Sequence, residues 1–129
     1  MKNLAFLLAL TAVCLAAPPT YSVANKIKLG GEGGWDYVYV DSAAQRIYVS
    51  HATKAIVIDS ASGKVTGEIA DTPGIHGIAV AADLGRGFTS NGRENMVTIF
   101  DLKTLAVISK VPVNGRNPDA IIYEPTTQR

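Results

Sequence analysis

Three polar residues stand at matching points of an internal repeat: Asp36, His76 and Asp119. Asp36 and His76 are 40 residues apart, and Asp119 follows after a further 43. Carboxylates and imidazoles act as general acids and bases, and they are also ligands for divalent metals. Because their spacing matches no metal-binding motif, we predict no metal and no cofactor. We expect a polar ligand-binding site, the alternative being that each side chain accepts backbone N–H groups or faces solvent.

Four other residues are candidates for the same site. His51 and Asn91 occupy equivalent positions at the ends of two repeated segments, and Arg93 follows closely. Trp35 directly precedes Asp36, and its ring is suited to stack on a ligand or to pack between neighbouring elements. We expect Trp35 at the site and the other three residues on its outer rim. No catalytic residue is predicted, since the serines of these segments belong to no Ser–His–Asp constellation in the sequence.

The elements that position these residues form two units, residues 35–73 and 74–116, and the start of a third, residues 117–129. Short apolar runs rich in β-branched and aromatic residues predict strands in each unit. They cover residues 36–41, 46–50, 55–59 and 64–69, then 77–81, 86–90, 96–101 and 105–111, and finally 119–124. No stretch keeps a helical periodicity. Asp36, His76 and Asp119 therefore stand where the first strand of each unit begins.

Four-stranded units with a period of about 40 residues are typical of β-propeller blades. We therefore predict an all-β chain of antiparallel four-stranded meanders, with about two and a quarter blades of an incomplete propeller. A β-sandwich is the alternative, but its strands need not repeat in groups of four. Tyr48 and Phe88 are expected in the core, and Asp59 and Asp101 are expected to cap the turn into each outer strand. In a propeller, the starts of the inner strands meet at the mouth of the central channel.

Two matching segments carry a family resemblance. Residues 48–51 read Tyr-Val-Ser-His and residues 88–91 read Phe-Thr-Ser-Asn, each followed by an apolar strand that ends in Asp. This pattern resembles the YVTN repeat of the YncE-like seven-bladed β-propellers. The resemblance implies a periplasmic or secreted protein, and it implies that residues 25–30 form the N-terminal closing strand. It also implies the N-terminal portion of a longer protein; the alternative is a small protein that self-associates through its open blade edges.

The first 24 residues have the order of a secretory signal peptide: Lys2, an apolar run over residues 4–17, and a small-residue exit at Ala24, with Ala17 as the alternative. The apolar run is shorter than the roughly 20 residues that span a bilayer, so we expect no membrane span after cleavage. Cys14, the only cysteine, lies within this segment. Residues 30–34 hold four glycines and no phosphate-loop motif, which predicts a turn with positive φ.

The expected function is a non-enzymatic platform that binds a small polar ligand or a protein partner. The alternative is a propeller enzyme, such as a lactonase or a quinone-dependent dehydrogenase, with its active site at the channel mouth. The formal net charge of +1 gives no electrostatic support for binding nucleic acid.

Overall fold

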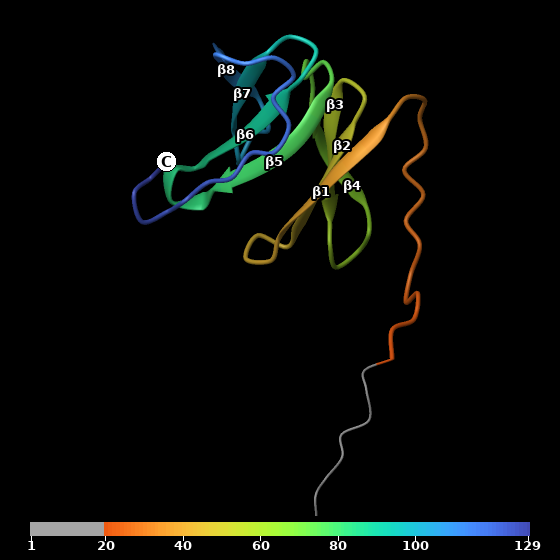
Figure 1. The fold of residues 1–129 in the computed structure, drawn as a ribbon. Coiled ribbons are helices and arrows are strands. Elements are labelled where there is room, and N and C mark those ends of the chain that lie inside the picture. The colour runs from red at the N-terminus through yellow and green to blue at the C-terminus, as the bar shows by residue number, and fades with distance from the viewer. Residues whose placement is uncertain (1–19) are drawn as a thin grey trace, which may run out of the picture.

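The computed structural model describes residues 20–129, which form two four-stranded antiparallel sheets side by side (Figure 1). The first sheet holds β1 (Trp35–Asp41), β2 (Arg46–His51), β3 (Lys54–Asp59) and β4 (Val65–Ile69). The second holds β5 (Ile75–Ala81), β6 (Arg86–Asn91), β7 (Met96–Asp101) and β8 (Val107–Pro112). Each sheet keeps its strands in chain order. The prediction of an all-β chain built from four-stranded propeller blades is confirmed.

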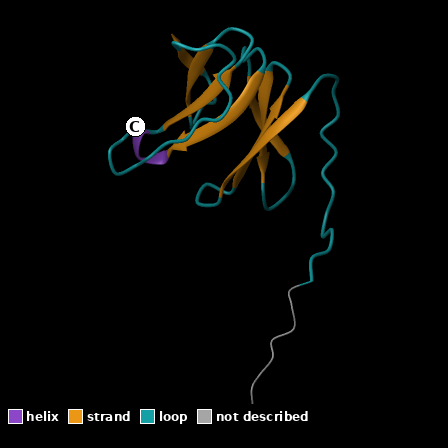
Figure 2. Ribbon diagram, viewed as in Figure 1, coloured by secondary structure: helices purple, strands orange, loops and turns teal. Residues whose placement is uncertain are grey.

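Helix is almost absent from residues 20–129, where the structure has a single 3₁₀ turn, η1 (Ala82–Leu84), between β5 and β6 (Figure 2). Within the same residues, no helix is long and apolar enough to cross a membrane. The predicted signal peptide falls mainly on residues 1–19, which lie outside the described part of the chain.

The turn into each outer strand is closed by an aspartate, as predicted. Asp59 Oδ1 accepts hydrogen bonds from the backbone N–H and the hydroxyl of Ser62, at 2.7 and 2.6 Å. Asp101 Oδ1 accepts hydrogen bonds from the backbone N–H of Lys103 and of Thr104, both at 2.9 Å. These bonds hold the pKa of both carboxyl groups below the usual value.

The hydrophobic core lies between the two blades. Tyr48 of β2 is fully buried and packs against Phe100 of β7, with ring centroids 6.2 Å apart. Ile78 of β5 joins the same cluster. Phe88, the counterpart of Tyr48 in the second blade, is only half-buried, so its predicted place in the core is correct only in part. The core thus forms where one blade meets the next.

The run of aromatic and β-branched residues at 36–41 predicts a strand buried on both faces, and this prediction is wrong. In β1, Val38 is 61% exposed, whereas its counterpart Ile78 in β5 is 3% exposed. The reason is that β5 packs against the first blade, and β1 has no blade on the corresponding side among residues 20–129.

Two further expected strands do not form. Residues 25–30 and residues 119–124 carry no strand pairing. A strand requires a ladder of backbone hydrogen bonds to a neighbouring strand, and neither segment forms such a ladder among the described residues. Residues 119–124 nevertheless lie beside β5, where the N–H of Gly77 donates to the carbonyl of Asp119 at 3.2 Å (Figure 1). Beyond them, Glu124 and Arg129 exchange two backbone hydrogen bonds across a turn.

Candidate functional site

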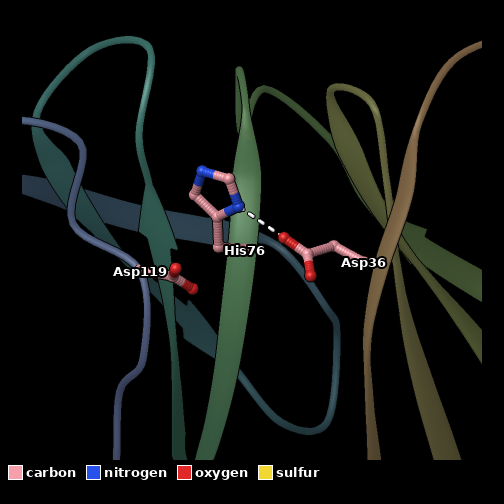
Figure 3. A group of neighbouring side chains, drawn as sticks. All are labelled: Asp36, His76 and Asp119. Atoms are coloured by element: carbon pink, nitrogen blue, oxygen red, sulfur yellow. Dashed lines mark hydrogen bonds and ion pairs between the residues drawn. The ribbon is translucent and has the colours of Figure 1, made fainter.

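The structure brings the three predicted polar residues together at one end of the inner strands. Asp36 comes from β1, His76 from β5, and Asp119 from the segment beside β5 (Figure 3). One ligand atom from each lies within 4.8 Å of the other two. His76 stands between the carboxylates, and its Nδ1 is 2.5 Å from Asp36 Oδ2. Residues far apart in the sequence therefore form one polar cluster.

An irregular start of each inner strand positions the first two of these residues. The pairing of β1 with β2 shifts register between Trp35 and Val38, and the pairing of β5 with β6 shifts between Ile75 and Ile78. A β-bulge inserts an extra residue and changes the direction of the neighbouring side chain. Asp36 and His76 fall inside these two shifts, which places them in equivalent positions.

A serine of the preceding blade holds the backbone at each of the later two positions. Ser50 Oγ of β2 donates to the carbonyl of His76 at 2.5 Å. Ser90 Oγ of β6 donates to the carbonyl of Asp119, and it also accepts from the N–H of Gly77 at 2.9 Å. Both serines are buried. Ser50 and Ser90 are thus interblade links.

Hydrogen bonds to both ring nitrogens hold the His76 imidazole. Nδ1 contacts Asp36, and Nε2 lies 3.3 Å from Oδ1 of Asn117. The bond to Asp36 raises the pKa of His76, partial burial opposes this effect, and the bond to Asn117 adds to it. The His76 side chain is 25% exposed and that of Asp36 is 42% exposed. The pair is therefore accessible from solvent.

The cluster borders a pocket of about 340 Å³. Asp36 and His76 line it together with Trp35, Arg93 and Asn117. The Asp36 carboxylate, the His76 imidazole and the Arg93 side chain place groups of both charge signs around a volume that holds a small ligand, and Asp119 adjoins it without lining it. Trp35 adds a large aromatic surface, since its side chain is 46% exposed. Trp35 and Arg93, two of the predicted site residues, both line this pocket.

His51 lies behind the pocket instead of on its rim. Its ring is 4% exposed and stacks on Trp35, with ring centroids 3.8 Å apart and planes 14° apart. Nδ1 donates to the carbonyl of Gly34 at 3.2 Å. The glycine-rich stretch closes over this ring: a Cβ on Gly31, whose φ is +99°, would lie 2.7 Å from His51 Nε2. His51 therefore stacks on Trp35 from the interior of the protein and holds the indole ring at the pocket.

Asn91 is also buried inside its blade and does not line the pocket. Its Nδ2 donates to Thr98 Oγ1 at 2.6 Å and to Glu94 Oε1 at 2.7 Å, and its Oδ1 accepts from Thr89 Oγ1 at 2.8 Å. With three polar partners and no exposed surface, Asn91 organises the end of β6. The structure thus excludes His51 and Asn91 from direct contact with a ligand in this pocket.

Asn117 and Gly92 are parts of the site that sequence reasoning missed. Asn117 has a φ of 49°, and its backbone N–H donates to Asn95 Oδ1 at 2.8 Å. Gly92 lies beneath the imidazole, where an added Cβ would be 2.6 Å from His76 Nε2. The signal for Asn117 was available: it aligns with Gly74, which has a φ of +66°, and Asn is among the residues that tolerate this conformation.

No family model matches the chain, and no curated protein sequence matches it. Solved structures do. Hydrazine synthase from Kuenenia stuttgartiensis superimposes with a TM-score of 0.68 at 20% identity, covering 81% of this chain and 30% of that one. AztD from Citrobacter koseri superimposes with a TM-score of 0.58 at 18% identity, covering 67% of this chain and 26% of that one. The β-propeller domain of Cps50 (Swd1) from Myceliophteria thermophila superimposes with a TM-score of 0.66 at 11% identity, covering 81% of this chain and 32% of that one.

The chain therefore spans less than a third of the length of each of these structures. At such low sequence identity the likeness concerns the fold alone. Together with the two four-stranded sheets and the interblade core, it shows that residues 35–112 are two adjacent blades of a β-propeller fold.

Proposed function

We propose that this chain belongs to an exported propeller protein that acts as a binding platform, and that a small polar ligand occupies the pocket at the mouth of its channel. The observation that carries the proposal is the meeting of Asp36, His76 and Asp119, one from each successive unit, within 4.8 Å. A polar cluster beside an exposed aromatic ring is the arrangement that orients small ligands. Export rests on the order of residues 1–24, and a YncE-like family membership rests on the repeat at residues 48–51 and 88–91.

Charge around the pocket favours a ligand with both donor and acceptor groups. Asp36 and Asp119 accept hydrogen bonds, whereas Arg93 and a protonated His76 donate them. The free face of Trp35 is suited to an apolar or cationic part of the same molecule. A ligand of this kind is the size of a monosaccharide, an amino acid or a dicarboxylic acid.

Trp35 provides the assay, because it is the only tryptophan of the chain and lines the pocket. Its fluorescence is followed while monosaccharides, amino acids and dicarboxylic acids are titrated onto the protein. We expect a saturable change with at least one class, weakened at least tenfold by Asp36→Asn or Asp119→Asn. The matched control is Glu68→Gln, the same change of charge on an exposed residue of β4. Equal affinity in all variants would show that the pocket does not bind the ligand.

An enzyme is the second candidate, and the hydrogen bond between Asp36 and His76 favours it. A carboxylate that orients an imidazole is a recurring feature of general bases. Because the neighbours include an enzyme, hydrazine synthase, the shared fold is compatible with either class. Ring opening of a sugar lactone, measured by proton release and abolished by His76→Ala, would replace the platform with a lactonase.

A further inference from the structure

We infer that the pocket takes up a zinc ion, bound by Asp36, His76 and Asp119. The inference rests on the proposed function, since it adds a metal ion to the residues that are proposed to bind the small ligand. It reverses the expectation from spacing alone, because ligands supplied by successive blades are separated by a whole repeat and form no short motif.

The donor set is the first argument. It offers one imidazole nitrogen and two carboxylate oxygens, and its two negative charges match a divalent cation. Mg²⁺ and Ca²⁺ prefer sites made of oxygen atoms, whereas an imidazole favours zinc and its neighbours among the transition metals. Three protein ligands with a free fourth position are typical of zinc sites that also bind a second molecule.

The surroundings of His76 are the second, independent argument. A histidine that binds a metal through one ring nitrogen usually donates the other N–H to a nearby oxygen. Here Asn117 Oδ1 lies 3.3 Å from Nε2 and can accept its N–H, so a zinc ion would take the place of the Nδ1 proton that now bonds Asp36. Asn117 is itself fixed by its backbone bond to Asn95. Gly92 has no side chain, and this makes room for the His76 ring and the Asn117 amide.

The present distances allow the ion after small side-chain movements. Bonds of about 2.0–2.2 Å in a tetrahedral site place ligand atoms about 3.3–3.6 Å apart. Asp36 and His76 at 2.5 Å must separate by about 1 Å, and the widest separation of 4.8 Å must shorten by a similar amount. Both Asp36 and Asp119 are exposed, so their carboxylates can move once the bond between Asp36 and His76 is replaced, whereas serine hydroxyls hold the backbone of His76 and Asp119.

Asp36 and His76 belong both to the proposed zinc site and to the pocket, which joins the zinc ion to the ligand of the proposed function. Arg93 and Trp35 line the same volume. A small carboxylate or a similar anion would reach the metal with one oxygen and the Arg93 guanidinium with another. The ion thereby selects an anionic ligand from the broader class of polar molecules.

The test measures zinc uptake by the full chain with Cys14 replaced by Ser, so that the thiol does not compete. Isothermal titration with zinc chloride should give one ion per chain, and Mg²⁺ should give no comparable heat. Asp119→Asn and His76→Ala should each weaken uptake at least tenfold, and Asn117→Ala should weaken it about 10- to 100-fold. Glu68→Gln should bind as the parent protein does. Circular dichroism confirms that each variant is folded.

Cobalt substitution adds a readout that does not depend on affinity. A tetrahedral site with nitrogen and oxygen ligands gives Co²⁺ a visible absorption band, which should disappear in His76→Ala. The inference is overturned if the folded parent protein takes up no zinc, or if Asp36→Asn and Asp119→Asn leave uptake unchanged.

Its failure is distinguishable from failure of the binding platform. The Trp35 titrations are repeated after dialysis against a chelator: a ligand that still binds with undiminished affinity refutes the zinc ion and supports the platform. A zinc ion that binds while no small molecule changes Trp35 fluorescence refutes the platform and supports the zinc ion.

Discussion

Gly92→Ala is the most direct test of how the site is assembled. The new methyl group would lie 2.6 Å from His76 Nε2 and overlap Asn117 Oδ1, so the imidazole and the amide must both move. The φ of Gly92 is not positive, and the backbone therefore accepts alanine without strain. The perturbation is steric and falls on the two groups that orient the proposed zinc ligand.

The expected magnitudes follow from these contacts. Changes that disturb the support of a metal-bound histidine cost about 10- to 100-fold in affinity, which corresponds to about 1.4–2.8 kcal/mol. Overpacking a core costs about 1–3 kcal/mol, but the cost is smaller here because the exposed Asn117 side chain can rotate away. Alanine also stabilises the protein by about 0.4–1 kcal/mol, because it reduces the conformational entropy of the unfolded chain. The free energy of unfolding should therefore fall by only about 1 kcal/mol while zinc affinity falls much further.

The assay combines zinc titration with urea unfolding of the parent and the variant. Gly115→Ala is the matched control, because a Cβ there meets nothing within 4 Å and its φ is not positive either. Zinc affinity in Gly92→Ala equal to that in Gly115→Ala would contradict this prediction. It would mean that the ring position set by Gly92 and Asn117 has no part in binding.

Three other predictions concern stability. Ser50→Ala should lower the free energy of unfolding in urea by about 1 kcal/mol, because a buried hydrogen bond to the carbonyl of His76 is lost. Gly87→Ala should lower it by about 3 kcal/mol, since the new methyl would overlap the buried ring of Phe100. The His76 pKa is raised by Asp36, so their pair stabilises the fold fully below the unfolded pKa of about 6.5 and ceases to do so as the pH rises through the folded pKa. For this partly exposed pair, the free energy of unfolding measured in urea should be about 0.2–1 kcal/mol higher at about pH 6 than at about pH 9. Asp36→Asn should abolish this difference.

Each of these has an outcome that would contradict it. If Ser50→Ala is no less stable than Ser109→Ala, an exposed serine on β8, then the interblade bond does not stabilise the fold. A Gly87→Ala protein with unchanged stability would mean that the blades separate easily at Phe100. An equal pH dependence in the parent and in Asp36→Asn would locate the titrating group elsewhere.

The sequence was sufficient for the architecture because the repeat is carried by local signals. The alternation of apolar strands with turn residues, and the aspartates at 59 and 101, depend on neighbours in the chain and recur with it. The packing partners of a residue do not recur with the repeat. Val38 and Ile78 occupy the same position in the repeat, yet they differ from 61% to 3% exposure because only one of them has a blade beside it.

Only part of the site could be predicted from sequence for a similar reason. The positions of Asp36, His76 and Asp119 follow from the repeat once a propeller is assumed. The burial of His51 and Asn91 does not, because it depends on partners brought together by folding: Trp35 and the glycine-rich stretch cover His51, and Thr98 bonds Asn91. His51 turned inward under Trp35, and Asn91 turned toward Thr98. The role of Asn117 was not predicted, because it depends on a left-handed backbone position, usually held by glycine, that places the amide beside His76.

The serine links make the three site residues unequal in freedom. His76 and Asp119 each have a backbone carbonyl held by the blade before them, and no serine among the described residues donates to the carbonyl of Asp36. His76 and Asp119 are therefore anchored to the preceding blade through their backbone carbonyls, and Asp36 lacks such a link within residues 20–129. If the proposed site binds a ligand, Asp36 should adjust more readily than the other two residues, and a contact that anchors the exposed start of β1 should slow release of that ligand.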